Sequence, residues 1–140
     1  MARILAIDYG TKRIGLAVTD PLQIIASQLE TVAAPAIFEW LERYLVAEEV
    51  ERIVLGEPFY PDGNPAQIHP QVMEFAQKIQ EKYPTIPVTL WNEAYSSERA
   101  KQVLLKSGAK RKKRRDKSMV DKIAAALILQ DYMEQCVWNQ

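Results

Sequence analysis

The sequence predicts an α/β protein with a mixed five-stranded sheet and helices on both faces, in the order β-β-β-α-β-α-β-α-α. Two observations predict this class. The N-terminal segment contains short runs rich in Ile, Leu and Val, which are typical of strands. From residue 35 onward, short apolar runs alternate with segments whose apolar residues recur at helical spacing. The length and the lack of a low-complexity linker predict a single domain over residues 1–140.

The first three strands are expected to pair as an antiparallel meander. Residues 3–8 and 14–19 flank YGTKR, a five-residue loop that contains Gly10, and this pattern predicts a β-hairpin. A weaker apolar run around Gln28–Val32 would add the third strand. The first strand ends on a carboxylate, Asp8, although the rest of it is typical of buried core.

The next segments alternate between helix and strand. Pro35 suits the first turn of a helix, and a second helix is expected to start near Pro70. Each helix leads into a short buried strand, at residues 52–56 and 88–91, and Asp62-Gly63 marks a turn after the first of these strands. The two apolar helix stripes are Ile37, Trp40, Leu41, Tyr44 and Leu45, and then Val72, Phe75, Ala76 and Ile79.

Two more helices are expected at the C-terminal end. Ser96 or Ser97 can cap the first of them, and Gly108 can close it. The last helix is expected over about residues 119 to 135. Its AAALIL stretch is apolar on every side, so this helix should be largely buried.

The predicted connections bring acidic residues to one edge of the sheet. Right-handed crossovers would place the strands at 52–56 and 88–91 beside the first strand and parallel to it. Open sheets of this kind bind ligands at the carboxyl ends of their parallel strands. Asp8, the Gly56-Glu57-Pro58 corner and Glu93 are all expected at that edge.

Taken singly, each acid also has a purely structural interpretation. Asp8 can begin the hairpin turn, and Glu93 can be a solvated loop residue. Ser118 and Asp121 have the spacing of a capping box at the start of the last helix. Taken together, Asp8, Glu93 and Asp121 would repel one another unless a cation lay between them. Mg²⁺ or Mn²⁺ suits such an oxygen-only site, and two ions can hold a phosphodiester.

A basic run lies between the last two predicted helices. The chain has 18 basic and 18 acidic residues, so its net charge predicts no partner. Residues 110–117, KRKKRRDK, nevertheless concentrate positive charge and predict contact with a polyanion, although a solvated loop would have the same composition. The basic residues of this run are Lys110, Arg111, Lys112, Lys113, Arg114, Arg115 and Lys117.

Other features limit the location and the remaining candidates. No run is long enough to span a membrane, and Cys136 is the only cysteine, so a cytoplasmic protein is expected. A monomer and a homodimer are both compatible with the sequence. His69 is interpreted as a loop residue, and Trp91 and Trp138 as packing residues.

Four blocks of the sequence resemble the YqgF (RuvX) family. They are IDYGTKRIGLAVTD, GEPFYPDG, NEAYSSERA and VDKIAAALILQDYM, and they span nearly the whole chain in the family's order and spacing. Members of that family have a ribonuclease H-like fold. They are described as Holliday junction resolvases and as nucleases that mature the small-subunit ribosomal RNA precursor.

The resemblance implies metal-dependent hydrolysis of structured nucleic acid, either an rRNA precursor or branched DNA. By position, the family's acids fall on Asp8, Glu93 and Asp121, with Asp8 bridging two Mg²⁺ or Mn²⁺ ions and the other two acids each holding one side. Water would attack the phosphorus and expel a 3′-hydroxyl. Lys12 and Arg13, together with the basic run, would contact phosphates.

Two of the four blocks depart from the family pattern. The third block usually begins Asp-Glu-Arg, whereas this chain has Asn92-Glu93-Ala94. An apolar residue usually stands where this chain has Glu57, whose charge could replace part of the missing negative charge.

Two other functions stay open at this point. The departures at Asn92 and Ala94 modestly favour a non-catalytic nucleic-acid-binding factor in ribosome assembly. The D-x-G-T hairpin also opens the nucleotide-binding half of actin-like and sugar-kinase-like proteins, but those proteins close two such domains around ATP. This chain has room for only one.

Overall fold

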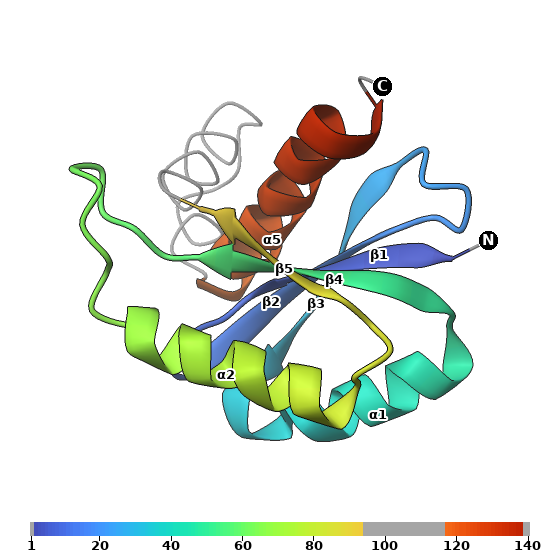
Figure 1. Ribbon diagram of the computed structural model, residues 1–140, viewed down its shortest axis with the longest axis horizontal. Coiled ribbons are helices and arrows are strands. Elements are labelled where there is room, and N and C mark those ends of the chain that lie inside the picture. The colour runs from blue at the N-terminus through green and yellow to red at the C-terminus, as the bar shows by residue number, and fades with distance from the viewer. Residues whose placement is uncertain (1, 94–116, 139–140) are drawn as a thin grey trace.

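The computed structural model describes residues 2–93 and 117–138, and the side chains of residues 117–122 lie outside the described part. Five strands form one sheet in the order β3-β2-β1-β4-β5 (Figure 1). The strands are β1 (Arg3–Asp8), β2 (Arg13–Thr19), β3 (Ala26–Ala33), β4 (Val50–Glu57) and β5 (Val88–Asn92). The helical elements are the 3₁₀ turn η1 (Ala34–Ala36), α1 (Ile37–Ala47), α2 (His69–Lys82), α5 (Lys117–Met133) and the π-helical turn η2 (Glu134–Trp138).

The pairing confirms the predicted mixed sheet. Strands β1, β2 and β3 form the antiparallel meander, while β4 is parallel to β1 and β5 is parallel to β4. The prediction that β5 would also lie beside β1 is wrong. One edge of β1 is occupied by β2 and the other by β4, so β5 does not pair with β1 and instead lies outside β4.

The sheet separates two apolar layers, because successive strand residues point to opposite faces. In β1, Leu5 and Ile7 pack with the stripes of α1 and α2. Ile4 and Ala6 pack on the other face with α5. Figure 1 shows α1 and α2 together beneath the sheet and α5 on the opposite side.

Helix α5 is as buried as its composition predicts. Residues 123–129 are all buried, since α5 lies directly against the sheet. Among the described residues, no helix is long and apolar enough to cross a membrane.

One of the two expectations about the C-terminal helices differs from the structure, and the other is not tested by it. Helix α5 begins at Lys117, so Ser118 lies within it and does not form the cap of the predicted capping box. The helix predicted after Ser96 or Ser97, with its end at Gly108, lies outside the described residues.

Candidate active site

Two acids meet at the carboxyl edge of the sheet, as predicted. Asp8 is the last residue of β1, and Glu93 directly follows β5. Strand β4 lies between β1 and β5 in the sheet. Their side chains share a hydrogen bond. Burial raises the pKa of Glu93, and the hydrogen bond with Asp8 opposes this shift to a smaller extent. A hydrogen bond between two carboxyl groups requires a proton on one of them, which agrees with the raised pKa of Glu93.

Gly56 of β4 makes room for this pair. A Cβ atom at residue 56 would collide with the Glu93 carboxylate and would lie 2.8 Å from Cδ1 of Ile128 in α5. The Glu93 backbone N–H also donates to the carbonyl oxygen of Glu57, at 3.0 Å. The position of the Glu93 carboxylate therefore depends on the missing side chain at Gly56 and on the backbone hydrogen bond between Glu93 and Glu57.

Glu57 does not add its charge to the acidic pair. Its Oε2 lies 2.9 Å from Nε2 of His69, the first residue of α2, so the side chain is directed to the α2 face of the sheet. The His69 ring also packs against Phe59 at a centroid distance of 5.4 Å. The hypothesis that Glu57 restores negative charge at the site is therefore wrong, because strand alternation sends it to the other face from Gly56.

The loop after β1 forms a cavity beside Asp8. Gly10 allows this loop to fold back, since any side chain there would collide with the carbonyl group of Arg13. The cavity has a volume of about 350 Å³, and Asp8, Lys12 and Arg13 are among the residues that line it. Two of the predicted phosphate-binding residues therefore lie next to the first acid.

The third acid and the basic run lie mostly outside the described part of the chain. The backbone of Asp121 belongs to the second turn of α5, but its side chain is among those not described. Residues 110–116 are not described, and Lys117 is placed only as the start of α5. Within the described side chains, no three His, Cys, Asp or Glu residues gather closely enough to hold a metal ion.

Sequence reasoning missed the Glu57–His69 pair, because nothing in the local pattern relates residues twelve positions apart. The interpretation of Trp91 as a packing residue is confirmed, whereas Trp138 is exposed. The Trp91 indole N–H donates to Asp131 of α5 at 2.7 Å, and its ring packs edge-on against Tyr132. The Trp138 indole N–H donates to the carbonyl oxygen of Gln23 at 2.8 Å.

The sequence pattern of one family, described as "RuvX: Holliday junction resolvase", matches residues 2–135. This chain belongs to the RuvX family. The four blocks noted above were therefore a correct guide to the family.

Similar proteins cover nearly the same length. A RuvX relative from Christiangramia forsetii is 47% identical over 133 residues, which are 95% of this chain and 98% of the relative. One from Porphyromonas gingivalis is 43% identical over 134 residues, 96% of this chain and 97% of the relative. Both bear the name "putative pre-16S rRNA nuclease".

Among solved structures, Thermus thermophilus RuvC in complex with a Holliday junction substrate has the same fold. It covers 97% of each chain with a TM-score of 0.53 and 18% sequence identity. The likeness supports the predicted ribonuclease H-like α/β class for this RuvX chain.

The partly buried Glu93 predicts a specific pH dependence of stability without divalent cations. The raised pKa of Glu93 means that the folded protein binds a proton more tightly than the unfolded chain, whose value is near 4.5. The free energy of unfolding should therefore fall as pH rises through the interval between that value and the folded pKa. Glu93→Gln, which cannot ionise, should lack this decrease.

Thermal unfolding in chelator across this pH range measures the effect. The matched control is Glu49→Gln, at an exposed position just before β4. The same decrease in wild type and Glu93→Gln would show that Glu93 does not hold the extra proton.

Gly56→Ala should displace the Glu93 carboxylate. We expect a loss of about 1–3 kcal/mol of stability from overpacking, and a loss of nuclease turnover of about 100-fold if a shifted carboxylate misplaces the reacting groups. In a Glu93→Ala background the same substitution should cost much less stability, because its main collision is gone. A double-mutant cycle by chemical denaturation measures this coupling. Equal costs in both backgrounds would contradict the contact.

Proposed function

We propose that this protein is a divalent-cation-dependent endonuclease that hydrolyses phosphodiester bonds in structured nucleic acid. The observation that carries the proposal is the shared hydrogen bond between the Asp8 and Glu93 carboxyls at the carboxyl edge of a RuvC-like sheet. Membership of the RuvX family and the nuclease names of its relatives support the same activity.

The two acids suit a divalent cation chemically. They offer only oxygen donors, which Mg²⁺ and Mn²⁺ prefer, and burial makes two adjacent negative charges unfavourable without a counter-charge. We propose that Asp8, Glu93 and Asp121 hold the cation or a pair of cations. Bound there, a divalent cation supplies Lewis acidity at the phosphoryl group and favours ionisation of the water that attacks it.

The residues of the chain have distinct parts in this proposal. Asp8 and Glu93 would hold the cation through their carboxylate oxygens, which bind a metal in the ionised form. Gly56 keeps the Glu93 carboxylate against β4. Lys12 and Arg13, on the rim of the loop cavity, hold the substrate phosphates next to Asp8.

The substrate we propose is a ribosomal RNA precursor, with a branched DNA junction as the competing choice. The names of the relatives favour the precursor, and the family description favours the junction. Phosphate contacts are the same for both and do not decide between them. A cleavage assay that offers both substrates, with Mn²⁺ and with chelator, compares their cleavage rates directly.

Asp8→Asn should reduce cation-dependent cleavage by about 100-fold or more, because an amide cannot supply the charge that the cation requires. Folding and nucleic-acid binding should remain, since the amide keeps the shape of the side chain. The assay compares cleavage rates with Mn²⁺ alongside thermal melts and binding in chelator. Asp62→Asn, in the exposed loop after β4, is the matched control. Full cleavage by Asp8→Asn would remove Asp8 from the mechanism.

The basic residues should determine how binding depends on salt. On duplex DNA, each lost phosphate contact should reduce the log–log slope of affinity against salt by about 0.9. Lys12→Ala should reduce it by about one contact. Joint replacement of Lys112, Lys113, Arg114 and Arg115 by Ala should reduce it by several. An unchanged slope in the second variant would mean that the basic run is a solvated loop. Salt-sensitive binding without any cation-dependent cleavage would instead indicate a non-catalytic binding factor.

A further inference from the structure

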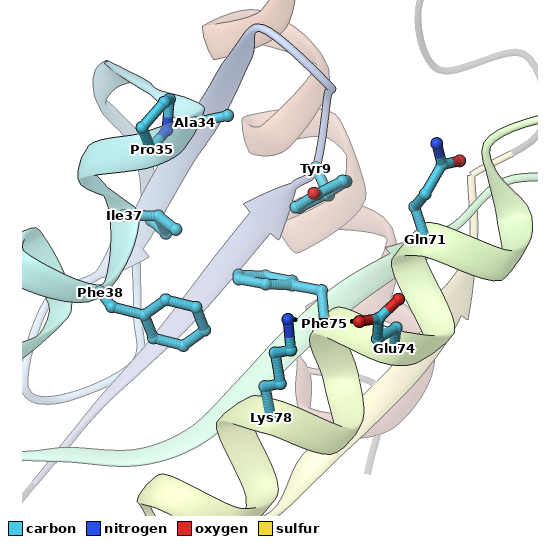
Figure 2. A pocket seen from close by; sticks show the side chains of 9 residues that line it. All are labelled: Tyr9, Ala34, Pro35, Ile37, Phe38, Gln71, Glu74, Phe75 and Lys78. Carbon is cyan, nitrogen blue, oxygen red and sulfur yellow. Dashed lines mark ion pairs between the residues drawn. The ribbon is translucent and has the colours of Figure 1, made fainter.

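A second cavity lies on the opposite face of the sheet from the acids. It has a volume of about 280 Å³ and opens between the start of α1 and the first turns of α2. Figure 2 shows three aromatic rings around it, from Tyr9, Phe38 and Phe75, with polar side chains along α2. We call this cavity the aromatic pocket, and the residues used in the argument are Tyr9, Phe38, Gln71, Glu74, Phe75 and Lys78.

The aromatic rings offer surfaces on which a flat ligand can stack. Phe75 is buried, with 4% of its surface exposed, and its ring centroid lies 4.7 Å from that of Tyr9 and 5.6 Å from that of Phe38. Tyr9 and Phe38 are only partly buried. Phe75 therefore anchors two rings that remain accessible from the cavity.

The mouth of the pocket is polar. Gln71, Glu74 and Lys78 are exposed residues of α2, and Lys78 pairs with Glu74 at 3.2 Å. An amide and a carboxylate offer both donors and acceptors for the edge of a heteroaromatic ring. An aromatic interior with few polar groups at its mouth suits one small, flat, polar-edged ligand.

The aromatic pocket and the loop cavity, where we propose that the phosphate binds, share one lining residue. Tyr9 lines both this pocket and the loop cavity of Asp8, Lys12 and Arg13. Tyr9 follows Asp8 directly in the chain and packs on the α2 face, whereas Asp8 joins Glu93 beside Gly56 on the α5 face. A strand that crosses this edge of the sheet can therefore place a phosphate at Asp8 and the adjoining base at Tyr9.

We propose that the aromatic pocket binds one unstacked nucleobase of the strand whose phosphate lies at Asp8. This inference rests on the proposed nuclease function and specifies its substrate, because only an unpaired nucleotide can place its base there. The pocket would thereby direct cleavage to positions next to unpaired bases. Its volume suits a single base and excludes a helix or a folded segment.

An abasic-site scan tests the proposal. Short oligoribonucleotides, each lacking one base, are bound to the full-length protein in chelator, and cleavage of the intact strand is measured separately with Mn²⁺. Stacking of a base on aromatic side chains predicts a roughly 5- to 100-fold loss of affinity when the critical base is missing. Wild type should show this loss at one position and little change elsewhere.

Phe38→Leu should strongly weaken the position effect, since it keeps an apolar side chain but removes one of the two accessible stacking rings. Tyr44→Leu is the matched control on the same helix, because the Tyr44 ring stacks on Trp40 outside the pocket. It should keep the full effect. Gln71→Ala, at an exposed position on which packing does not depend, should weaken the effect with the fold intact.

Each outcome has a separate meaning. The base pocket is overturned if wild type shows no critical base, or if the affinity loss persists undiminished in Phe38→Leu. Cleavage of the intact strand together with no critical base would leave the nuclease function standing and the pocket rejected. A critical base that depends on Phe38, without cleavage under any divalent cation, would support the pocket and contradict the nuclease function. No binding of any strand would overturn both.

Discussion

The proposed chemistry depends on two partly buried carboxyl groups brought together at the carboxyl edge of the sheet. Asp8 and Glu93 come from strands separated by β4, and only the missing side chain at Gly56 lets Glu93 occupy the space between them. Burial then makes their charges unfavourable, which raises the pKa of Glu93. The fold thus places two carboxylates where their charges repel each other, and a bound cation would offset this repulsion. A site of this kind trades some stability of the metal-free protein for affinity toward its ion.

Because successive strand residues point to opposite faces of the sheet, neighbouring residues at this edge belong to different sites. Asp8 and Gly56 are on the face of α5, where the acids meet. Their neighbours Tyr9 and Glu57 are on the face of α1 and α2, where Tyr9 joins the aromatic pocket and Glu57 pairs with His69. A shift of one residue along either strand would exchange these roles. The register of β1 against β4 is therefore as important to the proposed site as the identity of its residues.

Much of the fold could be read from local patterns. The apolar runs of β1, β2 and β4, the stripes of α1 and α2, and the uniformly apolar stretch of α5 are local consequences of burial, so their positions were predicted closely. The position of β5 outside β4 was not predicted. Each edge of β1 can pair with only one strand, and the sequence does not show which strand pairs there. The start of α5 also differed, because Ser118 continues the helix where a cap was expected.

The sequence by itself determined the family, through the four RuvX blocks, and the residues of the proposed chemistry, namely acids at the ends of apolar strands and a glycine loop with Lys12 and Arg13. Only the tertiary structure decided which of these side chains meet. It joined Asp8 to Glu93, turned Glu57 away to His69 and gathered Tyr9, Phe38 and Phe75 around one cavity. The reason is that side-chain chemistry is local, whereas distances across a sheet follow from strand order and register, which no single segment of the chain encodes.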